Sequence, residues 1–163
     1  MKTLTALFVG LGSIGTRHLN NLAALCAQRG WTLEADALRS DLHRPLRPGV
    51  AEKLHAQYTG TDQLPARYDV IFITPTSLHA EALRTVYGRG GALFIEKPIF
   101  SAEQTGLKLQ DYLPAGQKAY VAAPMRWCGT MLALKELLPT LHPYCARVIC
   151  SSYLPDWRPG VDY

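Results

Sequence analysis

The sequence predicts an α/β fold built on a doubly wound parallel sheet. Short apolar runs alternate with segments of helical periodicity along most of the 163 residues. This alternation is typical of parallel β-α-β units with helices on both faces of one sheet. Apolar residues make up 48% of the chain and charged residues 18%, close to the average for globular domains, so we expect an ordered core.

We expect strands where short apolar runs, rich in β-branched and aromatic residues, end at glycine, proline or charged residues. The clearest run is D-V-I-F-I-T at residues 69–74. The expected strands are residues 4–9, 32–38, 69–74, 92–96, 119–123 and 147–154.

We expect helices where apolar residues recur at spacings of three and four, or where a capping signal precedes them. Leu19 and Leu25 belong to the apolar face of the first helix, and Ser101 and Gln104 have the spacing of a capping box. The expected helices are residues 14–29, 50–57, 78–87, 101–113 and 130–138, the last one ended by Pro139 and Pro143.

Charge and hydropathy exclude several classes of partner. The formal charge of +4 is spread along the chain, and the most basic stretch, residues 39–47, is interrupted by Asp41 and Pro45, so we expect no nucleic-acid partner. The sequence contains no run of about 18 apolar residues, so it predicts no membrane-spanning helix. The start of the sequence does not resemble a signal peptide, and the four cysteines form no C-x-x-C pair. We therefore expect a cytoplasmic protein with reduced thiols and no metal site.

A glycine-rich motif follows the first expected strand. Residues 10–15 read G-L-G-S-I-G, with glycines at Gly10, Gly12 and Gly15. The first glycine permits the tight turn, the second leaves space for a diphosphate, and the third allows close packing of helix on strand. The backbone N–H groups around Ser13 and Ile14 then face the phosphates at the helix N-terminus. This strand–turn–helix context predicts a dinucleotide site of the Rossmann type.

The end of the second expected strand predicts the choice of cofactor. An acidic residue at that point usually holds the ribose hydroxyls of NAD, but this chain has Arg39 and Ser40 there. An arginine suits a bidentate contact with a 2′-phosphate, so we expect NADP(H) in preference to NAD(H), with NAD(H) still possible. Three alternatives stay open: Asp41 reaches the ribose, Asp36 does so if the strand ends early, or Arg39 is a solvated surface residue.

The loop after the third expected strand is the next candidate. Thr74, Pro75, Thr76 and His79 lie in T-P-T-S-L-H, directly before an expected helix. A proline directly after a strand turns the chain outward, and a Thr or Ser before a helix caps it. We expect this loop beside the nicotinamide ribose; alternatively it is a capped loop with a structural His79.

The segment Glu96, Lys97 and Pro98 ends the strand expected at residues 92–96. A lysine beside a positively charged nicotinamide ring is suited to exchange a proton with a substrate hydroxyl. The alternative is a salt bridge between Lys97 and Glu96 at the strand end. The Lys97–Pro98 bond is a candidate for the cis form.

These motifs, in this order, resemble the glucose–fructose oxidoreductase and inositol dehydrogenase family (Gfo/Idh/MocA). The matching segments are G-L-G-S-I-G-T-R-H at residues 10–18, T-P-T-S-L-H-A-E at 74–81, E-K-P at 96–98 and A-A-P-M-R-W at 122–127. The resemblance covers essentially the whole chain. It implies that Lys97 is the catalytic lysine, that Arg126 borders the substrate cleft, and that hydride moves to or from a hydroxyl-bearing carbon of a sugar, polyol or nucleotide-sugar.

In that family a second, open-faced β-sheet domain follows the nucleotide-binding domain, and further catalytic residues lie in it. We expect a nucleotide-binding domain at residues 1–123, a connecting helix at 124–143, and the first strand and loop of a second α/β domain at 144–163. The sequence ends soon after the expected strand at 147–154, so we expect an amino-terminal portion that binds cofactor without appreciable turnover. An unpaired strand edge there predicts a homo-oligomer.

Two other functions fit parts of the pattern. The first is a non-enzymatic nucleotide-binding module, which would sense a cofactor or dock to a partner. A methyltransferase also has a glycine loop after its first strand, but it generally has an acid after the second strand, where this chain has Arg39.

Overall fold

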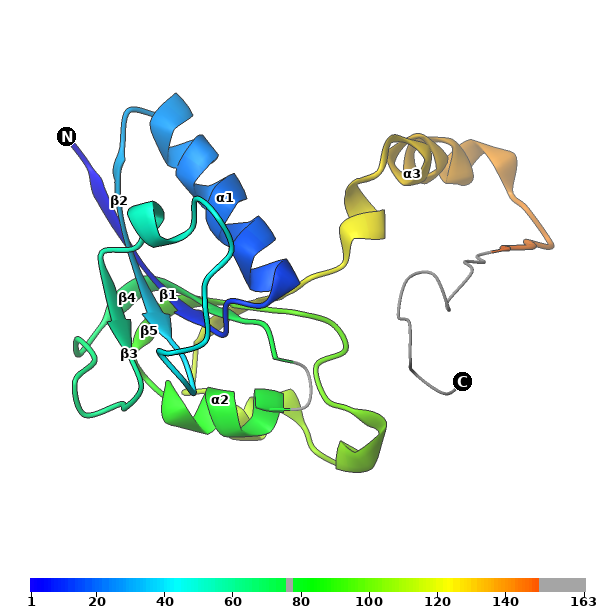
Figure 1. The fold of residues 1–163 in the computed structure, drawn as a ribbon. Helices are drawn as coiled ribbons and strands as arrows, with labels where there is room; N and C mark the ends of the chain where they lie inside the picture. The colour runs from blue at the N-terminus through cyan, green and yellow to red at the C-terminus, as the bar shows by residue number, and fades with distance from the viewer. Residues whose placement is uncertain (76–77, 150–163) are drawn as a thin grey trace. The chain divides into compact units, whose positions relative to one another are not determined.

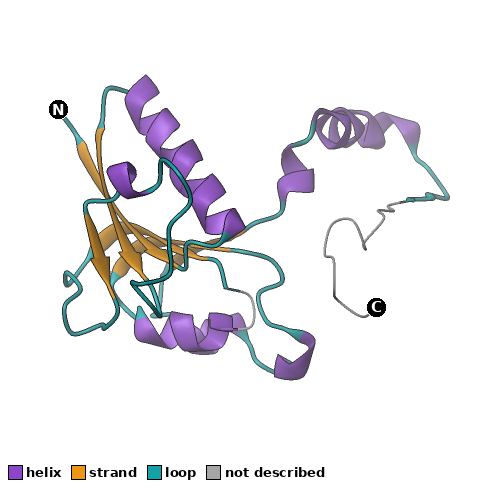
Figure 2. Ribbon diagram, in the orientation of Figure 1, coloured by secondary structure: helices purple, strands orange, loops and turns teal. Residues whose placement is uncertain are grey.

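The computed structural model describes residues 1–75 and 78–149. These residues divide into two compact units, Met1–Ala123 and a second unit that begins at Pro124. The nucleotide-binding domain expected from the sequence ends at the same residue as the first unit. Figure 1 shows the chain from its N-terminus in blue to its C-terminal part, and Figure 2 shows the secondary structure of each unit.

The first unit contains a six-stranded sheet in the order β3-β2-β1-β4-β5-β6, with every neighbouring pair parallel. The chain begins at the centre with β1, moves outward to β3, returns to β4 and continues to the other edge. This arrangement confirms the doubly wound fold and places a switch in strand order between β1 and β4, where ligands of such sheets bind. The strands are β1 Thr3–Val9, β2 Thr32–Leu38, β3 Ala56–Tyr58, β4 Tyr68–Ile73, β5 Gly90–Ile95 and β6 Lys118–Val121.

Helices cover both faces of this sheet, as Figures 1 and 2 show. Helix α1 (Ser13–Gln28) lies on one face and helix α2 (His79–Thr85) on the other. Successive strand residues point to opposite faces, so Phe8 packs in a cluster with Leu19 of α1, whereas Leu7 packs in a second cluster with Leu83 of α2. Because all six strands are parallel, their carboxyl ends lie at the same edge of the sheet.

The first helix face was predicted only in part. Leu19 is buried as expected, and Cys26 is buried with it, but Leu25 is half-exposed because the apolar stripe of α1 is narrower than its leucine spacing indicates.

Two of the helix predictions made from the sequence are wrong. Residues 50–57 form a single 3₁₀ turn, η1 (Ala51–Lys53), followed by strand β3, which pairs with β2. Residues 101–113 form two 3₁₀ turns, η3 (Ala102–Gln104) and η4 (Leu109–Tyr112). The expected capping box of η3 is present, but the chain leaves the helical conformation at Thr105, which has ψ 138°, and Gly106 after it has φ +91°.

The second unit contains the 3₁₀ turn η5 (Pro124–Trp127) and helix α3 (Gly129–Leu141). Pro139 was expected to end this helix but lies inside its last turn, where a proline removes one backbone bond near the helix end. The helix instead stops at His142, which has φ +42°. Residues 147–149 are not in a strand, and the rest of the strand expected at 147–154 lies outside the described residues.

No helix within the described ranges 1–75 and 78–149 combines the length and the apolar character needed to cross a membrane.

Candidate dinucleotide-binding site

The glycine loop joins β1 to α1 and each glycine has a distinct physical role. Gly10 has φ +86°, a turn that residues with side chains rarely adopt. A Cβ on Gly15 would lie 2.4 Å from the carbonyl oxygen of Gly10, so only glycine permits this close approach of helix and strand. A Cβ on Gly12 would meet no atom within 4 Å. Because nothing in the described chain requires a glycine there, the open space above Gly12 fits a bound ligand.

The N-terminus of α1 offers unpaired backbone donors. The helix spans 16 residues, has no side-chain cap and carries no acidic residue in its first turn. The first helical hydrogen bond runs from the N–H of Thr16 to the carbonyl of Gly12 at 2.9 Å, so the N–H groups of Ser13, Ile14 and Gly15 have no partner within the helix. Unpaired N–H groups at a helix N-terminus, together with the helix dipole, favour the binding of an anion.

A cleft of about 630 Å³ opens at this edge of the sheet. The glycine loop forms one wall, and the segment after β2 forms another. Six residues that were each expected to contact the cofactor line the cleft: Gly10, Gly12, Ser13, Arg39, Ser40 and Pro75. A dinucleotide would therefore meet the unpaired amides and the arginine in one continuous space.

Arg39 is held in place by neighbouring segments. Its Nη1 donates a hydrogen bond of 2.6 Å to Oε1 of Gln57, and its Nη2 donates to the carbonyl of Arg44. Ser40 and Asp41 beside it are exposed. The Asp41 carboxylate accepts the backbone N–H of His43 at 2.8 Å.

Asp36 is not available to a ribose. Strand β2 continues to Leu38, and the buried carboxylate of Asp36 accepts a 2.8 Å bond from the Tyr68 hydroxyl and lies 3.0 Å from Nδ1 of His55. Burial, and then the hydrogen bond to Asp36, raise the pKa of the Tyr68 hydroxyl. The hydrogen bond and the charge of Asp36 raise the pKa of His55. The alternative that placed Asp36 at the strand end is wrong.

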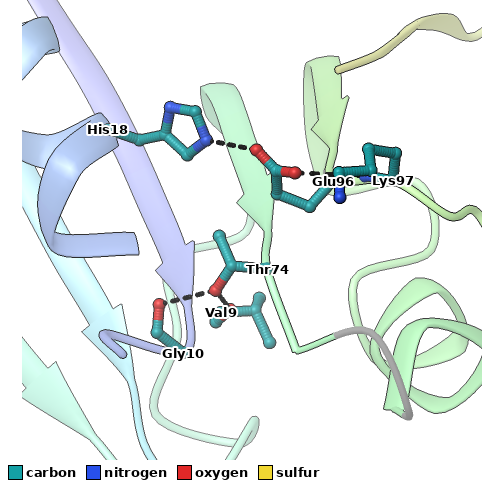
Figure 3. Close-up of polar contacts among 6 residues, drawn as sticks. All are labelled: Val9, Gly10, His18, Thr74, Glu96 and Lys97. Atoms are coloured by element: carbon teal, nitrogen blue, oxygen red, sulfur yellow. Dashed lines mark hydrogen bonds and ion pairs between the residues drawn. The ribbon is translucent and has the colours of Figure 1, made fainter. Parts of the chain in front are cut away.

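Thr74 supports the start of the glycine loop. Its buried hydroxyl lies 3.0 Å from the carbonyl oxygens of Val9 and Gly10, to which it donates (Figure 3). The structure thus gives Thr74 a positioning role at the start of the loop, while Pro75 lines the cleft itself. Thr76 lies outside the described residues, and its expected contact with the cofactor stays a prediction.

His79 begins α2 and is fully buried. Its Nδ1–H donates a 2.8 Å hydrogen bond to the carbonyl of Ile99, and its buried Nε2 has no hydrogen-bond partner among the described residues. His79 therefore ties α2 to the segment that follows Pro98. Its expected contact with the cofactor stays a prediction.

Glu96 connects three parts of the domain. Its Oε1 lies 2.7 Å from Nε2 of His18 on α1, and its Oε2 accepts the backbone N–H of Lys97 at 3.2 Å (Figure 3). The partner of the Glu96 carboxylate is thus His18, and the expected alternative of a salt bridge to the Lys97 side chain is wrong. Glu96 is buried, whereas Lys97 is exposed.

The Lys97–Pro98 bond is cis, as anticipated, and Pro98 is exposed.

Sequence reasoning missed two residues that matter at this edge. His18 lies within the motif at residues 10–18, and its place one turn after Gly15 was the signal that could have drawn attention to it. Gln57 lies in the strand that was expected to be a helix, so its contact with Arg39 was hidden. Arg126 is exposed in η5 of the second unit, and its role toward a substrate stays a prediction.

An uncapped helix N-terminus at the switch in strand order, with a cleft that continues to the end of β2, defines a dinucleotide-binding Rossmann domain. The model of the Gfo/Idh/MocA family, an oxidoreductase family with an NAD-binding Rossmann fold, matches residues 4–122. The chain belongs to this family, which confirms the resemblance found in its motifs. A comparison with curated proteins finds no match.

Proposed function

We propose that this chain binds NADP(H), and that it forms the cofactor-binding part of a dehydrogenase acting on a hydroxyl-bearing carbon of a sugar, polyol or nucleotide-sugar. The observation that carries the proposal is one continuous cleft that joins the uncapped N-terminus of α1 to Arg39. When bound, the nicotinamide ring would supply the hydride acceptor or donor. The remaining chemistry falls to the residues of the chain.

The preference for NADP(H) is supported by the groups at the end of β2. A guanidinium group has five N–H donors, and the contacts with Gln57 and Arg44 occupy one on each terminal nitrogen of Arg39. The remaining N–H donors of Arg39 are left for the oxygens of a 2′-phosphate. Arg44 and Arg47 line the same cleft and add positive charge, while Asp36 is engaged inside the domain.

The other site residues divide the work between binding and proton transfer. The amides of Ser13, Ile14 and Gly15 would bind the diphosphate. Glu96 fixes the backbone of Lys97 through the bond to its N–H, and Lys97 would move a proton between its Nζ and the substrate hydroxyl. Arg126 would contact the substrate.

The test of this proposal is the pair of dissociation constants for NADPH and NADH, measured by titration calorimetry. Wild type should bind NADPH more tightly. Arg39→Ala should weaken NADPH binding by about tenfold or more, because it removes charge-assisted hydrogen bonds, and should change NADH binding by less than about twofold. Arg67→Ala, which removes one positive charge at an exposed arginine, is the matched control. Tighter binding of NADH by wild type would refute the preference.

A further inference from the structure

We propose that Gln57 is a specificity-determining residue, which prepares Arg39 to receive the 2′-phosphate of NADP(H). This inference rests on the function proposed above and adds to it a residue outside the motifs of the sequence. Gln57 does not line the main cleft, and its effect would pass through the guanidinium group of Arg39. It is therefore a positioning residue.

The backbone brings the two side chains together. In the parallel pairing of β2 with β3, Ala37 lies opposite Gln57 and Leu38 opposite Tyr58. The N–H of Arg39 donates to the carbonyl of Tyr58 at 2.8 Å, which extends the pairing past the end of β2. Because alternate strand residues share a face, Arg39 lies on the same face as Ala37 and Gln57. This register places the two side chains diagonally across neighbouring strands.

Two neutral acceptors then fix the guanidinium plane. Oε1 of Gln57 accepts from Nη1 at 2.6 Å, and the carbonyl of Arg44 accepts from Nη2. An arginine free in solvent loses rotamer freedom when it binds an anion, and these contacts remove part of that freedom before binding. Neither acceptor carries a charge, so the positive charge of Arg39 stays available. A carboxylate in place of Gln57 would hold the arginine but neutralise it.

The surroundings of this pair are basic. A second cavity, of about 430 Å³, lies beside the main cleft and is lined by Gln57, Arg39, Arg44 and Arg47, with Glu52 as the acidic residue. Arg39, Arg44 and Arg47 line both cavities. Of the two cavities, Gln57 lines the second, and its hydrogen bond to Arg39 connects it with a residue of the main cleft. The chemistry fits a phosphate monoester at the cleft side of Arg39.

The experiment compares Gln57→Ala and Gln57→Glu in the full chain, again with the dissociation constants of NADPH and NADH. Gln57→Ala should weaken NADPH binding by about fivefold, since the arginine side chain must then be ordered on binding, and should leave NADH binding within about twofold. Gln57→Glu should weaken NADPH binding by about tenfold or more through charge neutralisation. Gln110→Ala and Gln110→Glu, at an exposed residue of η4, are matched controls and should bind both cofactors as wild type does.

A double variant separates this inference from the function on which it rests. In an Arg39→Ala background, Gln57→Ala should have no further effect on NADPH binding. The inference is overturned if Gln57→Ala weakens NADPH and NADH equally, or if it has the same effect with and without Arg39. If wild type prefers NADPH, and Arg39→Ala alone abolishes the preference, then unchanged Gln57 variants overturn this inference while the proposed function stands. If wild type prefers NADH, both fail.

Discussion

The carboxyl ends of β2 and β5 lie at the same edge of the sheet but are built in different ways. At the end of β2, the exposed Gln57 holds Arg39, and both line a cavity. At the end of β5, the buried Glu96 holds His18 on α1 and the backbone of Lys97. The first end can change without disturbing the core, whereas the second is part of it. We therefore expect substitutions at the β2 end to alter binding alone, and substitutions at the β5 end to alter stability as well.

The glycine loop contains one position where a substitution should alter stability and one where it should alter binding. The first of these gives the largest expected effect. Gly15→Ala places a Cβ 2.4 Å from a backbone oxygen that cannot move cheaply. We expect a loss of about 2–3 kcal/mol in the free energy of unfolding, measured by urea denaturation. Gly12→Ala is the matched control: its Cβ meets nothing within 4 Å, so it should cost about 0.5 kcal/mol yet weaken binding of either cofactor. Equal stability of the two variants would contradict this division of roles.

Glu96→Ala tests the β5 end directly. It removes the acceptor of two hydrogen bonds at a buried position and leaves the Lys97 N–H and the His18 ring without their partner. We expect the free energy of unfolding to fall by about 1–3 kcal/mol. Glu103→Ala, at an exposed residue of η3, should change it by less than about 0.5 kcal/mol. If the two variants unfold at the same urea concentration, Glu96 is not part of the core.

The two ends also differ in how far the sequence predicts them. Apolar runs ended by glycine or charged residues locate β1, β2, β4 and β5 to within two residues, because these central strands are buried on both faces and carry a strong local signal. The glycine loop comes directly after β1 and the E-K-P segment directly after β5, so predicting the ends of these strands also locates both motifs.

Contacts between distant segments carried no such signal. Strand β3 has three residues, A-Q-Y, and exists through its register with β2, so neither the strand nor the contact of Gln57 with Arg39 was visible. His18 and Glu96 are 78 residues apart, and the local neighbour of Glu96, Lys97, was the partner that the sequence offered. In residues 101–113 the capping signal was correct, but the backbone is extended at Thr105 and left-handed at Gly106, so the helix has one turn.

The smallest expected effect concerns the attachment of β3, which supports the β2 end. His55, directly before β3, has a side chain 61% exposed, and its Nδ1 lies 3.0 Å from the buried carboxylate of Asp36. The hydrogen bond and charge of Asp36 raise the pKa of His55, with a further contribution from Glu34. A raised pKa in the folded state means that protonation favours folding. This stabilisation is complete below the ordinary histidine pKa of about 6.5 and is lost as the pH rises through the raised value.

Urea denaturation at a series of pH values from below 6 to above 8 would measure this contribution. Wild type should exceed His55→Asn in denaturation midpoint at the acidic end, and the difference should shrink as the pH rises. High salt should reduce it, because the imidazole is exposed to solvent. Gln63→Asn, at an exposed residue without a titratable group, should show no such pH-dependent difference from wild type. A difference for His55→Asn that grows with pH would have the wrong sign, and it would mean that β3 is not held to β2 by this ion pair.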